Sequence, residues 1–204
     1  MSAESGKILR CNPASWRRPD CRNSTIGIKT GFAALDAVLP DGGWPVGALT
    51  EVLSKASDSD ELRLVAPALA QLGRNSRWQA WIAPPYVPYA PALVEAGINL
   101  SRTFFARPNQ GTDPLWVIER TLRAGVCDAV LSWPETNDFR ALRRLQLAAE
   151  QGGCWGVMFR AAHFASDPSP AALRLRLHTL DDGFEIHILN ARGGCRYPSV
   201  RLTF

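Results

Sequence analysis

The 204-residue sequence has no long apolar run, and its first residues lack the apolar core of a secretory signal. The longest apolar stretches, 64–70 and 124–131, fall well short of the roughly 18 to 20 residues that a membrane-spanning helix needs. The opening residues, MSAESGK, are small or polar. We therefore expect a cytoplasmic protein without a membrane span.

Lysine is scarce, and cysteines are not paired in sequence. Of the 23 basic residues only Lys7, Lys29 and Lys55 are lysines, and the net charge of +4 is too small to indicate nucleic-acid binding by itself. The five cysteines are scattered, with no C-x-x-C and no histidine pair nearby. This spacing argues against a disulfide framework and against a metal site, so the thiols are interpreted as buried or incidental.

Apolar residues make up 46% of the chain, enough for one α/β domain of this length. Short β-type runs alternate with helical patterns and then give way to two alternating runs joined by Asp181-Asp182-Gly183. This order predicts a mostly parallel sheet flanked by helices, with a C-terminal antiparallel β-hairpin extension. The expected strands are 49–53, 78–83, 103–106, 129–132, 155–159, 173–180, 184–189 and 200–204, and the expected helices are 59–72, with a kink at Pro67, 89–96, 115–124 and 139–151.

Residues 1–25 are polar and lack periodicity, so they are predicted to form a flexible or extended arm before a domain at 26–204. Trp16, Arg17 and Arg18 are the arm's candidate partner-binding residues, because aromatic and arginine side chains dominate binding interfaces. The arm packing onto its own domain is the other interpretation.

Three segments carry a resemblance to RecA-type recombinases. The run TGFAALDAVLPDGGWPVGALTEV at 30–52 is similar to the segment that leads into the RecA core. LRAGVCDAVL at 122–131 resembles the approach to that family's magnesium-associated aspartate, and 188–204 resembles its closing hairpin. The resemblance implies a RecA-like domain over residues 26–204.

The residues that should bind ATP are missing from this frame. A phosphate-binding loop reads G-x-x-x-x-G-K-[ST], because glycines let backbone N–H groups surround the phosphates while the lysine reaches them. The matching positions have Ser54 and Ser59 for the glycines, and Asp60 and Glu61 for the lysine and hydroxyl residue. Acidic groups there would repel a triphosphate, so the sequence predicts a degenerate loop.

Two further positions agree with this loss. The resemblance puts the family's catalytic glutamate at Pro85 and its magnesium-linked aspartate at Trp133, and neither side chain can serve those roles. The three histidines have no motif that pairs them with a nucleophile. We therefore expect no catalytic residues, no cofactor and no enzymatic activity.

A RecA-like frame without an ATP site resembles the ImuA proteins of bacterial mutagenesis cassettes. That resemblance implies an SOS-induced accessory protein of translesion DNA synthesis that binds the Y-family-like protein ImuB, RecA, or both. It also implies indirect work with an error-prone DnaE-type polymerase, with weak DNA contact left open.

A second resemblance gives the alternative. The residues at 64, 67–69, 71–73 and 76–81 are similar to the core of SulA, the SOS division inhibitor that blocks FtsZ assembly. That family lacks the 30–52 segment and the long C-terminal hairpin, so the ImuA reading is preferred here.

Arginines supply the other candidate partner-binding residues. Arg140, Arg143 and Arg144 share one face of the 139–151 helix, while Phe139, Leu142 and Leu145 should face the core. This face is a site for DNA phosphates or an acidic partner, or simply a solvated surface. In the loop at 160–172, Phe164 is either a base-stacking platform or folded onto its own domain. Arginines on the C-terminal strands are expected on an exposed, positively charged surface that includes Arg174, Arg176, Arg192, Arg196 and Arg201.

Overall fold

The computed structural model describes residues 27–55, 61–109, 111–192 and 199–203. Several predicted positions lie outside these ranges: the arm with Trp16, Arg17 and Arg18, then Ser59 and Asp60, and Arg196.

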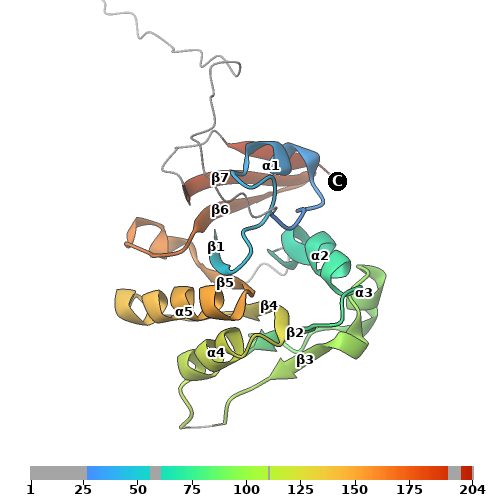
Figure 1. Cartoon of the computed structure of the whole chain (residues 1–204). Coiled ribbons are helices and arrows are strands. Elements are labelled where there is room, and N and C mark those ends of the chain that lie inside the picture. The colour runs from blue at the N-terminus through green and yellow to red at the C-terminus, as the bar shows by residue number, and fades with distance from the viewer. Residues whose placement is uncertain (1–26, 56–60, 110, 193–198, 204) are drawn as a thin grey trace, which may run out of the picture.

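The described chain forms one eight-stranded mixed sheet with the order β3-β2-β4-β5-β1-β6-β7-β8 (Figure 1). The first six strands pair in parallel, whereas β6, β7 and β8 pair in antiparallel fashion. A mostly parallel sheet with antiparallel C-terminal strands is thus confirmed. The strands are β1 (Ala48–Ser54), β2 (Trp78–Ile82), β3 (Thr103–Ala106), β4 (Cys127–Ser132), β5 (Trp155–Ala161), β6 (Leu173–Leu180), β7 (Gly183–Ala191) and β8 (Val200–Thr203).

Helices cover both faces of the sheet, because parallel strands are joined by crossovers that bury both faces. Helix α2 (Glu61–Leu72) and the short α1 (Ala33–Val38) pack on a core with Trp81 and Trp155. Helices α4 (Pro114–Arg123) and α5 (Phe139–Gly152) lie side by side on the other face, over Met158. Helix α3 (Ala90–Glu95) lies near the β2–β3 edge (Figure 1).

Strand β1 is central, and every residue in it is buried. Polar side chains on this strand must therefore find partners inside the protein. Thr50 accepts a hydrogen bond from the indole of Trp155 at 3.0 Å, and that indole stacks on Trp44 at 5.4 Å between ring centroids. This aromatic pair closes the α1 side of the core.

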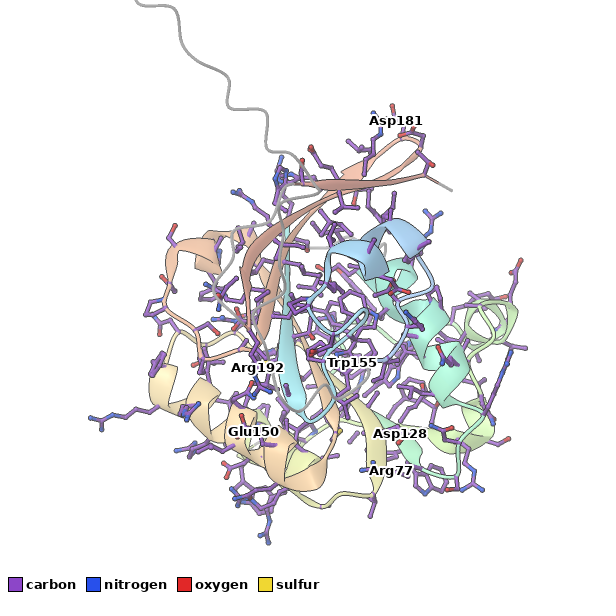
Figure 2. All side chains as sticks on the ribbon, turned by 45° about the horizontal axis from the view of Figure 1, so that its top comes forward. Arg77, Asp128, Glu150, Trp155, Asp181 and Arg192 are labelled. Atoms are coloured by element: carbon purple, nitrogen blue, oxygen red, sulfur yellow. The ribbon has the colours of Figure 1, made fainter. Side chains whose placement is uncertain are left out.

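The side chain of Arg77 holds the ends of α4 and α5 against the sheet. Its guanidinium donates to the carbonyl oxygens of Gly125 at 2.7 Å and Gly152 at 3.0 Å, and lies 3.4 Å from Asp128 (Figure 2). The Gly152 carbonyl belongs to the last residue of α5 and that of Gly125 lies just beyond α4, so neither has a partner within its helix. Arg77 is therefore a structural residue that joins two crossover connections.

Helix α5 has a capping residue at each end. Asp138 accepts a hydrogen bond from the backbone N–H of Arg140 at 2.8 Å, and Gly153 ends α5 with a φ of 57°. Helix α1 was not expected. Helix α2 continues through Pro67. The Pro67 ring packs closely against Gly31, because a Cβ added at Gly31 would lie only 2.4 Å from the Cβ of Pro67. Phe139 is 45% exposed, so its predicted core position is wrong, whereas Leu142 and Leu145 are buried.

None of the helices in the described ranges has the length and apolar character required to cross a bilayer.

Candidate protein-interaction site

A buried ionic network lies on the α5 side of the central strands. The Glu51 carboxylate is fully buried and contacts two arginines, with Arg160 Nη1 at 3.0 Å and Arg174 Nε at 2.6 Å. Ser169 donates to the same carboxylate at 2.6 Å. Two guanidiniums therefore share one carboxylate, together with a hydroxyl from the crossover that joins β5 to β6.

The same arginines fix that crossover. Arg174 donates to the carbonyl oxygens of Phe164 at 2.9 Å and Asp167 at 3.0 Å, and Arg160 donates to that of Thr136. The Arg160 guanidinium also lies 4.2 Å from the centroid of the Phe164 ring. Phe164 is thus folded onto its own domain, and the prediction that Arg174 lies on an exposed surface is wrong because this side chain is 9% exposed.

Next to this network lies a small cavity of about 240 Å³ between α5, the end of β7 and the loop before β6. We call it the α5–β7 cavity. Figure 2 shows two of its side chains, Arg192 and Glu150, beside one another, and their charged atoms are 3.3 Å apart. The cavity is lined by Arg143, Gln146, Glu150, residues 170–172, Asn190 and Arg192.

The predicted basic face of α5 divides into different environments. Arg144 lies 3.2 Å from Glu119 of α4, and Arg143 lines the α5–β7 cavity. Arg140 is exposed at the start of the helix. The structure therefore brings Arg143 and Arg192 to one cavity, and neither Arg140 nor Arg144 lines it.

Exposed apolar side chains are concentrated in the segment that forms the outer edge of the sheet, on both of its faces. Seven of the eleven large apolar side chains that are exposed in the described ranges fall between residues 78 and 105. Exposed aromatic side chains that are concentrated in one region often mark a binding site. We call this region the β2–β3 edge surface, and it comprises Trp78, Tyr86, Val87, Tyr89, Val94, Phe104 and Phe105.

Local geometry explains why these side chains remain in solvent. Strand β3 is the edge strand of the sheet, so Phe104 and Phe105 have a neighbouring strand on one side only and are incompletely covered. Trp78 contacts Phe104 with 6.3 Å between ring centroids, and Phe105 contacts Trp81 with 5.3 Å. Edge strands with exposed apolar side chains favour association with another protein.

The loop after β2 adds the most exposed members of the surface. Ala83 has a φ of 51° and donates from its N–H to Ala106 at 2.8 Å, which turns the chain outward after β2. Tyr86, Val87 and Tyr89 are 65%, 79% and 72% exposed. Sequence reasoning missed these residues, although apolar side chains between prolines in a loop were the available signal.

Four of the positions that the RecA resemblance matched to an ATP site, Ser54, Glu61, Pro85 and Trp133, lie in the described ranges. Ser54 donates a hydrogen bond to Glu61 in the first turn of α2. Trp133 stacks on Phe159 with 5.1 Å between ring centroids, and Pro85 is exposed.

Several titratable groups outside the α5–β7 cavity and the β2–β3 edge surface have structural roles. Burial raises the pKa of the Cys127 thiol to about 11 and also raises the pKa of Cys154. His178 faces His187 across the hairpin with 5.3 Å between ring centroids, and burial together with nearby Arg176 lowers its pKa. Asp181, at the hairpin tip (Figure 2), and Asp182 form the predicted turn, and Asp182 pairs with Arg201 at 2.9 Å.

Exposed aromatic side chains and arginines are enriched in protein–protein interfaces, so these two regions favour a protein that binds a partner. The model of the family "Cell division inhibitor SulA" matches residues 47–156. A SulA of Edwardsiella piscicida is 30% identical over 143 residues, which cover 70% of this chain and 76% of that protein. A SulA of Yersinia enterocolitica is 26% identical over 134 residues, covering 65% and 79% respectively. The crystal structure of SulA from Pseudomonas aeruginosa is 29% identical, covers 55% of this chain and 97% of that one, and has a TM-score of 0.46.

This chain belongs to the SulA family. The preferred ImuA interpretation is therefore wrong, and with it the expected role in translesion synthesis and the expected partners ImuB, RecA and the DnaE-type polymerase. The physical reason is that the 30–52 segment and the hairpin, which favoured ImuA, reflect the general arrangement of the sheet. The residues at 64–81, which resemble SulA, fill the core between α2 and β2: Leu64, Ala68, Leu69 and Trp81 are fully buried, and Gln79 donates to the carbonyl of Leu69 at 2.6 Å.

Proposed function

We propose that this protein inhibits bacterial cell division by binding FtsZ and blocking its assembly, as part of the SOS response. Membership of the SulA family supports this function, because the curated relatives are named cell division inhibitors. The action is stoichiometric binding rather than catalysis, and a cytoplasmic location is part of the proposal.

The observation that carries the proposal is the β2–β3 edge surface. All seven of its residues lie within the segment 47–156 that the family model matches. Tyrosine and tryptophan dominate binding energy in protein interfaces, since they bury large areas with few rotatable bonds. We place the FtsZ contact on this surface, with Tyr86 and Tyr89 as its most exposed aromatic groups.

The frame that presents this surface is proposed to be a degenerate RecA-like domain at 26–204, preceded by an arm at 1–25. Support comes from β1, which is followed by 54–61 and α2, and from the antiparallel strands that close the sheet. Glu61 stands where a nucleotide-binding loop would need a hydroxyl group, which supports the absence of nucleotide binding. Magnesium-dependent binding of a labelled ATP analogue would overturn this part of the proposal.

The division-inhibition proposal is tested with purified FtsZ and the full chain. The chain should reduce GTP-dependent FtsZ sedimentation in proportion to its concentration, and its overexpression should produce filamentous cells. Tyr86→Ala and Tyr89→Ala should each require about tenfold more protein for the same inhibition, since truncation of an interface aromatic side chain costs about 1–2 kcal/mol or more.

Trp116→Ala is the matched control, because Trp116 is 54% exposed but lies on α4 outside the edge surface. It should inhibit like the unmodified chain. Unchanged FtsZ sedimentation at excess inhibitor would refute the function, whereas equal inhibition by all three variants would refute only the location of the contact.

A further inference from the structure

The α5–β7 cavity has a charged lining that is only partly neutralised. Its charged lining residues are two arginines, Arg143 and Arg192, and one glutamate, Glu150, which contacts Arg192. The Arg192–Glu150 contact is 3.3 Å long, and the Arg192 side chain is 62% exposed. Such an exposed pair contributes little stability and rearranges easily, so one positive charge in the lining remains available.

Arg143 supplies that charge. Within the described part of the chain, its guanidinium makes no ion pair or hydrogen bond, in contrast with Arg144 one residue later. The side-chain amide of Asn190, on the facing strand, likewise makes no hydrogen bond there. The cavity therefore combines a guanidinium fork with an amide donor, and its carboxylate, Glu150, already receives hydrogen bonds from Gln146 and Arg192.

The floor and wall of the cavity are held in place by the fold. Gln146 is 2% exposed, accepts from the N–H of Leu49 at 3.0 Å and donates to Glu150 at 2.8 Å. The N–H of Arg192 donates to the carbonyl of Ala172 at 2.8 Å. Ser169, which binds the buried Glu51, also accepts from the N–H of Ala171. The backbone around the cavity and the Gln146 side chain are therefore held in place, whereas the arginine side chains are free to adjust to a ligand.

We propose that the α5–β7 cavity binds a carboxylate, as presented by an acidic side chain of a peptide partner. A single negative charge complements the one uncompensated positive charge, and the guanidinium fork matches a carboxylate in bidentate geometry. A phosphate dianion fits less well, because Glu150 would repel its second charge.

This site is separate from the proposed FtsZ contact. Three of its lining elements, residues 170–172, Asn190 and Arg192, lie beyond the segment 47–156 matched by the family model. The carboxylate proposal therefore stands or falls without any measurement on FtsZ, and failure of the division assay leaves it unaffected.

The test is a titration of the isotopically labelled full chain at low salt, followed through backbone amide chemical shifts. The probes are an end-capped tetraglutamate peptide, acetate, inorganic phosphate and a short oligothymidylate. The peptide should shift amides at 143–150, 170–172 and 190–192, while acetate shifts the same amides more weakly. Arg143→Gln should weaken peptide binding about tenfold or more, since a charge-assisted hydrogen bond is lost.

Arg140→Gln is the matched control, because Arg140 lies on the same helix and carries the same charge but does not line the cavity. It should change peptide affinity less than about twofold. Arg143→Lys keeps the charge without the fork and should fall between the two. Unchanged denaturation midpoints for all variants would show that each remains folded.

Other results overturn the proposal. Equal weakening by both glutamine variants would reduce the effect to the general positive field of α5. Tighter binding of phosphate or oligothymidylate that depends on Arg143 would assign the cavity to phosphate groups. Acetate shifts without any peptide binding would show that the cavity excludes a peptide, and shifts outside the cavity would place the peptide elsewhere.

Discussion

Glu51 offers the sharpest test of how the sheet is held together. Its carboxylate is fully buried and is shared by Arg160, Arg174 and the hydroxyl of Ser169. Glu51→Gln keeps the size of the side chain but leaves two buried guanidiniums without a counter-charge. Breaking a buried ion pair from one side costs about 3–5 kcal/mol, because the remaining charge cannot be hydrated. That loss is a large part of the 5–15 kcal/mol typical of a domain.

The loss should appear in urea unfolding followed by circular dichroism, as a lower midpoint at an unchanged slope. The melting temperature should fall by about 6 to 20 °C, at about 2–4 °C for each kcal/mol in a domain of this size. Glu185→Gln is the control, because Glu185 is 41% exposed and contacts only His187 at 3.4 Å among described ion-pairing groups; its substitution should cost less than about 0.5 kcal/mol.

A second variant separates charge from packing. Replacing Glu51 with Leu, and both Arg160 and Arg174 with Met, removes every charge from the network while keeping most of its volume. Exchange of a buried ionic cluster for apolar side chains is often neutral, so this triple variant should be more stable than Glu51→Gln. A free energy of unfolding for Glu51→Gln within about 1 kcal/mol of the parent would refute the reasoning, since the guanidiniums would then be hydrated in the folded state.

Arg77→Ala should lower the free energy of unfolding by about 2 kcal/mol, because charged hydrogen bonds to two carbonyl groups are lost, whereas Asp128→Asn should cost less than about 1 kcal/mol; equal losses in urea would contradict the clamp. A Cβ on Gly152 would lie 1.9 Å from a backbone oxygen of α4, so Gly152→Ala should lower the free energy of unfolding by about 3 kcal/mol. Gly111→Ala is the control and should cost about 1 kcal/mol, because nothing lies within 4 Å of its added Cβ. Similar melting temperatures for the two variants would show that α4 and α5 separate freely. Burial raises the pKa of Cys127 from 9.0 to about 11, so the thiol ionises at lower pH in the unfolded chain than in the folded one. The free energy of unfolding should therefore fall as the pH rises through that interval. Iodoacetamide labelling of Cys127 that is equally fast in folded and urea-unfolded protein would contradict its burial.

Periodicity was sufficient to locate most elements of the sheet. The expected strand at 49–53 lies inside β1, and the expected helix at 139–151 lies inside α5. Helix α1 was missed because it has six residues and no side-chain cap, which leaves little local signal. Phe139 was placed in the core by its spacing from Leu142, but it occupies the first position of α5, where the chain is still exposed.

The candidate sites depend on long-range contacts that a linear pattern does not contain. Arg174 alternates with leucines as a surface residue would, yet its partner Glu51 is 123 residues away. Arg143 and Arg144 were both assigned to one basic face of the helix, but only Arg144 meets a carboxylate of the neighbouring helix. The edge surface depends on β3 being the last strand, which the order of strands along the chain does not reveal.

The position of β1 also bears on how the chain is made. This strand leaves the ribosome early, but its neighbours β5 and β6 begin at residues 155 and 173, and the partners of Glu51 follow it by 109, 118 and 123 residues. Contacts between such distant residues slow folding, because a long loop must close before they form. Until β5 and β6 have been synthesised, β1 has no strand on either side and Glu51 has none of its arginine partners. A charged side chain on an unpaired apolar strand disfavours its pairing with other chains.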